Sequence, residues 1–137
     1  MHTVRDIMTP APITLPLSAT VADAAREMRD ADVGDVLVVE GDELRGLVTD
    51  RDIVVRGLAT GLDASTPIGE LCSPGLLTVS PDEDTDVAAD LMASGAVRRL
   101  PVVESGRPVG ILALGDLAVQ RDPDSALGSI SSAPPNR

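Results

Sequence analysis

The sequence contains two copies of one pattern, separated by 64 residues. Shifted by this offset, Val4–Arg56 falls on Ile68–Gln120 without a gap. Matching residues then coincide along the whole overlap, including Pro10 with Pro74, Thr14 with Thr78, Met28 with Met92, Gly46 with Gly110 and Asp52 with Asp116. A register kept over this length indicates an internal duplication, in which each copy forms one structural unit.

Each copy predicts the element order β-α-β-β-α. The first copy has strand patterns at 13–15, 36–40 and 44–48, a helix that begins near Thr20, and a closing helix at 50–59 that places Ile53, Val54 and Leu58 on roughly one side. The second copy has strand patterns at 77–79, 100–104 and 109–112 and a helix that begins near Asp84. Neither copy carries enough apolar surface to stand alone. We therefore expect an α+β fold in which the repeats pack pseudo-symmetrically through their sheets and leave matched clefts between them.

The duplication also divides the chain. It predicts a first repeat at 1–59, a Gly/Asp/Ser/Pro-containing linker at 60–67 and a second repeat at 68–120. Residues 121–137 are rich in Ser, Pro and Ala, which favours a flexible tail over a docking segment.

Charge and composition exclude several classes of function. The net charge is −11 and the pI is near 4.3, so nucleic acid and anionic lipid would be repelled. The sequence has no aromatic residue on which bases could stack, and every basic residue except His2 is an arginine, which excludes a Walker lysine and Schiff-base chemistry. No apolar run reaches the roughly 18 residues of a membrane span. The start of the chain does not resemble a secretion signal, so a cytoplasmic protein is expected.

The inventory of catalytic side chains is poor. His2 lies close to the terminus and Cys72 has no neighbour in sequence that would lower its pKa, so neither a nucleophile pair nor a histidine-based metal site is indicated. The sequence predicts no enzyme, no required cofactor and no metal site.

One motif suits a ligand. Gly46, Thr49 and Asp52 fall where a strand is expected to run into a helix. The first turn of a helix attracts anions, and a carboxylate one turn in could accept both hydroxyls of a ribose. Thr49 and Asp52 also have the spacing of a capping box, which needs no ligand. The residues alone leave both interpretations open.

The chain resembles a tandem pair of CBS domains, also called a Bateman module, over about Val4 to Gln120. The resemblance rests on the opening Arg5–Pro10 (RDIMTP), on Leu100–Glu104 (LPVVE), and on the Gly-x-x-Thr-x-x-Asp pattern at Gly46, Thr49 and Asp52. It looks most like short stand-alone bacterial CBS proteins of the actinobacterial hypoxic-response type.

The resemblance implies a regulatory module that binds AMP, ADP or ATP, or less favourably S-adenosylmethionine or NADH, and signals to an unknown partner, usually as a homodimer. Asp52 would hold the ribose hydroxyls, and Thr49 would contact ribose or phosphate. Arg98 and Arg99 match the family's phosphate-binding segment, although surface salt bridging would also explain them. The second copy keeps Gly110 and Asp116 but has Ala113 in place of the hydroxyl, so it departs from the family's pattern at that site. The alternative function is a ligand-free structural or adaptor protein that acts through oligomerisation or docking.

Overall fold

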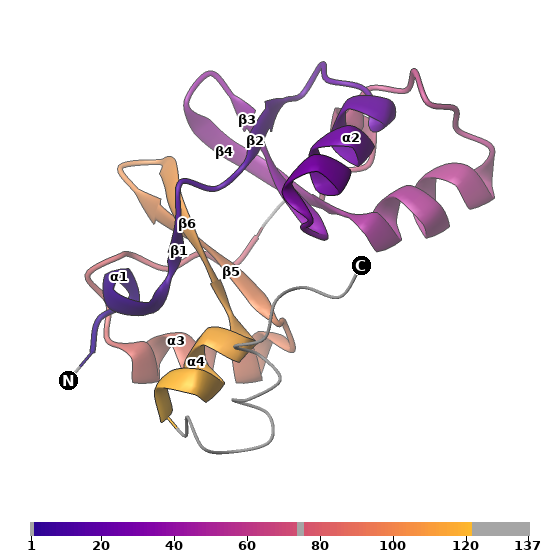
Figure 1. Cartoon of the computed structure of the whole chain (residues 1–137). Coiled ribbons are helices and arrows are strands. Elements are labelled where there is room, and N and C mark those ends of the chain that lie inside the picture. Colours follow the sequence, from indigo (N-terminus) through magenta and orange to yellow (C-terminus); the bar gives the residue numbers. More distant parts are fainter. Residues whose placement is uncertain (1, 74–75, 122–137) are drawn as a thin grey trace. The chain divides into compact units, whose positions relative to one another are not determined.

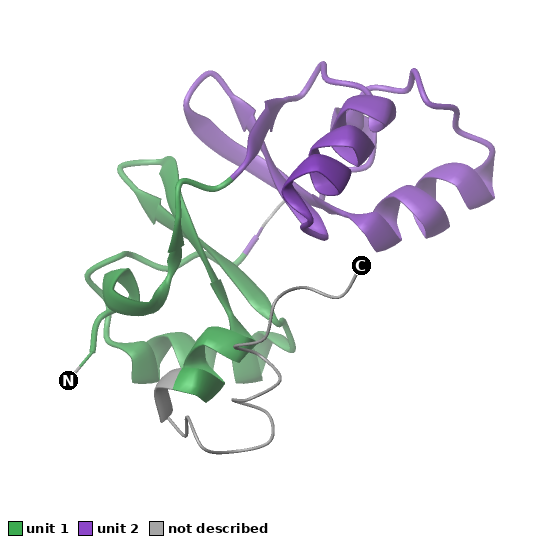
Figure 2. Ribbon diagram, in the orientation of Figure 1, with its two compact units in different colours: residues 1–12, 77–136 green, residues 13–76, 137 purple. Residues whose placement is uncertain are grey.

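The computed structural model describes residues 2–73 and 76–121 (Figure 1). They fall into two compact units (Figure 2). Within the described residues, unit 1 comprises 2–12 and 77–121, and unit 2 comprises 13–73 and 76. Each unit contains helices and one three-stranded sheet, so the predicted α+β class is confirmed. From residue 122 onward, the predicted tail lies outside the described residues.

Unit 2 is built on a sheet of strand order β2-β3-β4. Strand β2 (Thr14–Pro16) runs parallel to β3 (Asp35–Glu40), and β4 (Glu43–Thr49) returns antiparallel to β3. The turn between β3 and β4 uses Gly41 at a φ of 62°, a left-handed conformation that glycine adopts without steric cost. The strands that the sequence predicts at 36–40 and 44–48 are therefore confirmed.

Helix α2 (Val21–Ala31) begins where the sequence predicts. The Thr20 hydroxyl accepts a hydrogen bond from the Asp23 amide at 3.1 Å, and Asp23 Oδ2 accepts one from the Thr20 amide at 2.9 Å. This reciprocal pair is a capping box, which satisfies two amides that the helix itself leaves unpaired. The helix buries Val21, Ala24 and Met28, a spacing that places all three on one face.

The closing helical segment of unit 2 differs from the prediction. After two α-helical residues, 50 and 51, it becomes the π-helix η1 (Asp52–Gly57) and then the 3₁₀-helix η2 (Leu58–Thr60). Ile53 is buried, but Val54 and Leu58 are 56% and 58% exposed, so the three residues that the sequence places on roughly one side do not enter the core together. A π-helix is wound more loosely than an α-helix, and here Ile53 and Gly57 form its buried face.

Unit 1 has the sheet order β1-β6-β5. Strand β6 (Arg107–Ala113) pairs antiparallel with both β1 (Thr9–Pro10) and β5 (Arg99–Glu104), and the helices are α1 (Val4–Ile7), α3 (Thr85–Gly95) and α4 (Leu114–Arg121). The strand expected at 77–79 reduces to one parallel bridge between Val79 and Val102. Asp84 caps α3, as predicted, by accepting a hydrogen bond from the Asp86 amide at 2.7 Å.

The opening segments of the two repeats are exchanged. Residues 4–10 of the first repeat pack in unit 1 against the second repeat, and residues 68–73 of the second repeat pack in unit 2 against the first. Thr9 in β1 pairs with Ile111 of unit 1, and Ser73 pairs with Leu47 of unit 2, the equivalent contact under the 64-residue offset. The segment 68–73, which includes the 3₁₀-helix η3 (Ile68–Glu70), contributes the fully buried Ile68 to the core of unit 2. The compact units therefore do not coincide with the repeats 1–59 and 68–120 that the sequence defines.

Candidate functional site

Thr49 and Asp52 lie together where β4 ends and the closing helix of unit 2 begins. Asp52 Oδ2 accepts a hydrogen bond from the Thr49 amide at 2.9 Å, and the Thr49 hydroxyl accepts one from the Asp52 amide at 3.0 Å. The capping box that the spacing allowed is therefore present. Thr20 and Asp23 form the same pair at α2, so the Thr-x-x-Asp pattern starts more than one helix in this chain.

The capping box leaves binding capacity at both side chains. A threonine hydroxyl that accepts one hydrogen bond still has its own proton to donate and a second lone pair. A carboxylate offers about four acceptor positions, and the hydrogen bond from Thr49 uses one of them. The Asp52 side chain is 18% exposed, which leaves part of it open to solvent.

Gly46 lies within β4, opposite Val38, rather than at the end of the strand. A Cβ at this position would lie 2.9 Å from both Cβ and Sγ of Cys72 and 3.0 Å from the carbonyl oxygen of Ser73. Gly110 is equivalent, because its Cβ would lie 2.9 Å from the carbonyl oxygen of Thr9 and 2.5 Å from Met8 Sδ. Each glycine lets an opening segment approach the sheet closely, which is a packing role.

The corresponding helix start in unit 1 is only half capped. Asp116 Oδ2 accepts a hydrogen bond from the Ala113 amide at 2.8 Å, but Ala113 has no hydroxyl to return it. Burial raises the pKa of Asp116 above its ordinary value, and the hydrogen bond from Ala113 only partly opposes this. By contrast, hydrogen bonds from the Thr20 amide and hydroxyl lower the pKa of Asp23, the acid of a complete capping box.

The two units differ in charge at the residues that precede and open β5 in unit 1 and β3 in unit 2. Unit 1 has Arg98 and Arg99 at this position, both exposed, whereas unit 2 has Gly34 and the half-buried Asp35. In both units the residue before the strand touches the helix start: the Leu114 amide donates to the Arg98 carbonyl at 2.8 Å, and the Asp50 amide donates to the Gly34 carbonyl at 3.0 Å. The cationic position and the hydroxyl–carboxylate pair are thus divided between the units.

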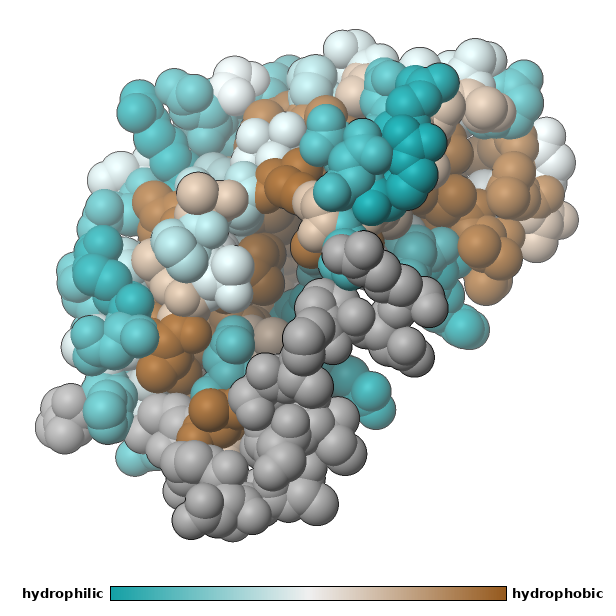
Figure 3. Space-filling view, viewed as in Figure 1, coloured by the Kyte–Doolittle hydropathy of each residue, from teal (hydrophilic) through white to brown (hydrophobic). Residues whose placement is uncertain are grey.

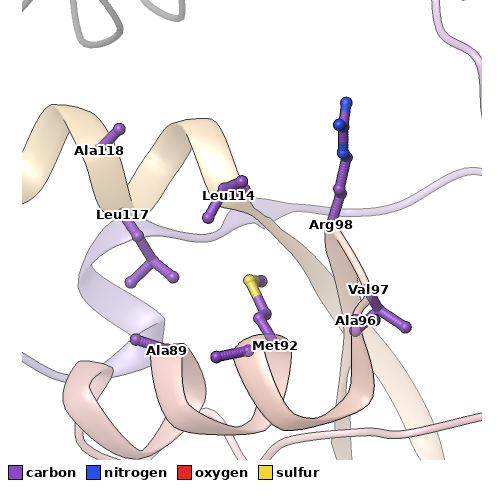
Figure 4. Close-up of a pocket in the computed structure, with 9 residues that line it drawn as sticks. Ala89, Met92, Ala96, Val97, Arg98, Leu114, Leu117 and Ala118 are labelled. Atoms are coloured by element: carbon purple, nitrogen blue, oxygen red, sulfur yellow. The ribbon is translucent and has the colours of Figure 1, made fainter.

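Arg98 also borders a hollow between α3 and α4 of about 530 Å³ (Figure 4). The Arg98 side chain forms no hydrogen bond or ion pair with another residue of the described part of the chain. Apart from Arg98, the lining is apolar: Ala89, Met92, Ala93, Ala96, Val97, Leu114, Leu117 and Ala118. The sequence does not predict this hollow, because its lining residues come from α3, from the three residues that follow its last turn, and from α4. Two strands separate α4 from the rest in the sequence.

Unit 2 has an apolar surface of its own over η1 and η2. Val54, Val55 and Leu58 are between 44% and 58% exposed, and Figure 3 shows hydrophobic atoms at the surface in this region. Exposed apolar groups that gather on one element mark contact surfaces more often than isolated ones do.

The sequence interpretation missed Arg56, which lies beside Asp52, and Ser73, which Arg56 contacts. Arg56 Nη1 is 3.6 Å from Asp52 Oδ1 and donates a hydrogen bond to Ser73 Oγ at 3.2 Å. The spacing of four between Asp52 and Arg56 is a recognisable sign of helical ion pairing. No sequence signal links Arg56 to Ser73, which is 17 residues further on.

Among residues 2–73 and 76–121 no three His, Cys, Asp or Glu side chains are grouped so that they could hold a metal ion. Cys72 is a free thiol, half-buried against Gly46. No helix in the described ranges has the length and apolarity needed to cross a membrane.

Comparison with known proteins identifies the family. Residues 4–58 and 68–120 each match the CBS domain. The CBS domain-containing protein YhcV of Bacillus subtilis is 41% identical over 129 residues, which cover 94% of this chain and 92% of the relative. Hypoxic response protein 1 of Mycobacterium tuberculosis is 38% identical over 120 residues, which cover 86% of this chain and 84% of the relative.

Solved structures agree with these matches. A crystal structure of Hypoxic Response Protein I with two coordinated zinc ions has a TM-score of 0.78 at 37% identity, covering 85% of this chain and 97% of that one. CBSX2 in complex with AMP has a TM-score of 0.76 at 28% identity, covering 88% and 96%. The family resemblance drawn from the repeated motifs is confirmed. With two matched domains that span most of its length, this chain belongs to the CBS domain family and carries a CBS pair similar to that of Hypoxic response protein 1.

Proposed function

We propose that this CBS pair is a regulatory module that binds an adenosine-containing ligand, AMP, ADP or ATP, and reports its level to a partner protein. The observation that carries the proposal is the division of polar groups between the repeats. Thr49 and Asp52 are intact at one helix start, and Arg98 and Arg99 precede and open strand β5 of the other repeat. The complex of the similar protein CBSX2 with AMP supports this ligand class.

In this proposal the first repeat supplies the ribose contacts. Asp52 accepts hydrogen bonds from the two ribose hydroxyls, and Thr49 donates its remaining proton to ribose or phosphate. Hydrogen bonds to a charged acceptor are roughly twice as strong as neutral ones, so Asp52 dominates the ribose contribution. The role of Gly46 is indirect, since it lets Cys72 and Ser73 pack against the strand that leads to Thr49.

The second repeat supplies the phosphate contacts. Arginine suits this role because its guanidinium group forms paired hydrogen bonds with phosphate oxygens and stays charged at all relevant pH values. The equivalent Asp35 in the first repeat would repel a phosphate. Asp116 faces no hydroxyl at position 113, so we propose that a second site with the opposite arrangement is incomplete.

We also propose that the module is a cytoplasmic, non-enzymatic homodimer. The apolar hollow between α3 and α4 and the exposed Val54, Val55 and Leu58 give each unit a helical surface that a second copy could cover. A ligand can shift the equilibrium between two arrangements of such a dimer only by binding one of them more tightly.

Calorimetric titration with AMP, ADP and ATP tests the ligand and its ribose site together. The expected result is binding to the unmodified protein and to Asp116→Ala, with loss of binding in Asp52→Ala. Circular dichroism confirms that each variant is folded. If none of the three nucleotides gives a detectable heat of binding to the folded protein at millimolar concentration, this ligand class is excluded.

A second candidate function is supported by the capping boxes. Because Thr49 and Asp52 satisfy each other as Thr20 and Asp23 do, they could serve folding alone. The protein would then be a ligand-free adaptor that acts through its helical surfaces. Retention of dimerisation and absence of nucleotide binding in the same preparation would favour this function.

A further inference from the structure

We propose that Arg56 is a positioning residue for the ligand: it orients the Asp52 carboxylate and ties it to 68–73, the opening segment of the second repeat. This inference rests on the proposed function for its ligand. It adds a residue, and a physical link, that the Gly-x-x-Thr-x-x-Asp motif does not contain.

One guanidinium nitrogen of Arg56 contacts both the Asp52 carboxylate and the Ser73 hydroxyl. Arg56 Nη1 is 3.6 Å from Asp52 Oδ1 and donates to Ser73 Oγ at 3.2 Å. The other oxygen of Asp52, Oδ2, accepts the hydrogen bond from the Thr49 amide at 2.9 Å. The carboxylate therefore has a partner at each oxygen, a hydrogen bond at Oδ2 and an ion pair at Oδ1, and the two together favour one orientation toward a ribose.

The helix and the 68–73 segment meet at this point. A Cβ on Gly57 would lie 3.2 Å from Leu71 Cδ1, so η1 approaches the segment closely one residue after Arg56. Leu71 is buried, and the Ser73 amide donates to the Leu47 carbonyl at 3.1 Å. Ser73 is thus fixed to β4 by its backbone and to Arg56 by its side chain.

The ion pair between Asp52 and Arg56 is less exposed than an ordinary surface ion pair, because Asp52 is largely buried. Its side chain is 18% exposed whereas that of Arg56 is 48% exposed, so the carboxylate end of the pair is partly desolvated. At the equivalent of Arg56 the second repeat has Gln120, which carries no charge. The second repeat has therefore lost both the hydroxyl at position 113 and the cation, which is consistent with one competent site.

Arg45 provides a matched control. It lies in the same unit, is 47% exposed and forms ion pairs with Glu40 at 3.0 Å and Glu43 at 3.3 Å. Arg45→Gln therefore removes the same charge and a comparable set of contacts at the other end of β4.

The binding experiment compares adenosine with AMP. Arg56→Gln is expected to weaken the binding of both by the same factor, about threefold to tenfold, because only the ribose contact is disturbed. Arg56→Lys should recover part of the affinity, and Arg45→Gln should leave it unchanged. A loss confined to AMP would show that Arg56 contacts phosphate, and unchanged affinity for both ligands would show that Arg56 does not orient Asp52; either result overturns the proposal.

A ligand-free measurement keeps this test separate from the proposed function. Amide hydrogen exchange at Thr49 and Ser73 should accelerate about threefold to tenfold in Arg56→Gln and not in Arg45→Gln, because Arg56 contacts both the carboxylate that accepts from the Thr49 amide and the side chain of Ser73. If wild-type protein binds neither adenosine nor AMP, the proposed function fails, and the exchange rates still decide whether Arg56 holds these groups. Equal exchange rates in wild type and Arg56→Gln would refute the link.

Discussion

Replacing Gly46 with alanine tests how closely the 68–73 segment packs on the sheet of unit 2. The new Cβ would lie 2.9 Å from Cys72 Cβ, 2.9 Å from Cys72 Sγ and 3.0 Å from the backbone oxygen of Ser73. Ordinary contacts of a Cβ begin at about 3.4 Å, so the segment must move by a few tenths of an ångström. Overpacking of this kind costs about 1–3 kcal/mol. Alanine also restricts the unfolded chain more than glycine does, which stabilises the folded state by about 0.4–1 kcal/mol. The net destabilisation is then about 1–2 kcal/mol.

The assay is urea and thermal unfolding followed by far-ultraviolet circular dichroism, because the sequence has no aromatic residue for fluorescence. A loss of this size lowers the unfolding temperature by about 3–8 °C. The cost of Gly46→Ala should shrink in a Cys72→Gly background, where two of the three close atoms are gone. Gly41→Ala is the control: its φ of 62° makes alanine unfavourable there, but nothing lies within 4 Å, so its cost should not depend on Cys72. Wild-type stability in Gly46→Ala would refute the close approach.

Three further predictions concern folding. Ala113→Thr should stabilise the protein by about 0.5–1 kcal/mol in urea unfolding, because the added hydroxyl can accept from the Asp116 amide and complete the capping box; a destabilised variant would contradict this. Asp116→Asn should raise the unfolding temperature near pH 7, because a raised pKa means that the ionised Asp116 destabilises the folded state once pH exceeds the ordinary aspartate value of about 3.9. The gain should fade below that pH. A gain that grows on acidification would contradict this prediction. Ile68→Ala should cost about 2–5 kcal/mol if the 68–73 segment closes the core of unit 2, whereas a cost below 1 kcal/mol would show that the segment is dispensable.

Local chemistry explains why much of the fold could be predicted. Thr20 and Asp84 cap their helices through contacts two or three residues away, and Gly41 supplies a turn between adjacent strands. Such signals lie within a few residues of each other and are repeated after 64 residues, so each copy supports the interpretation of the other.

The exchange of opening segments could not be predicted, because the two segments are duplicates and their sequences do not show which unit each one joins. Val4 and Ile68 occupy equivalent positions and both are fully buried, so either sequence pattern would suit the core of either unit. The different exposure of Ile53, Val54 and Leu58 could not be predicted either, because the pattern of apolar residues along one segment does not report which of them another segment covers.

The candidate site was only partly predictable. The spacing of Thr49 and Asp52 was correct for a capping box, and the structure shows that box, but a capping box and a ribose site use the same two residues. Arg56 acquires its second partner, Ser73, through the tertiary approach of the 68–73 segment. No single-sequence pattern reports such an approach.

Comparing adenosine with AMP by calorimetry, in wild type, Asp52→Asn and the double variant Arg98→Gln/Arg99→Gln, tests most directly the claim that ribose and phosphate contacts come from different repeats. We predict that Asp52→Asn weakens both ligands, and that the double arginine variant weakens AMP while leaving adenosine unchanged. Each charge-assisted contact should change affinity by about tenfold to a hundredfold, which corresponds to the roughly 1.5–3 kcal/mol of such hydrogen bonds. If the arginine variant binds AMP as tightly as wild type, or if Asp52→Asn leaves both affinities intact, the division of the site between the repeats is wrong.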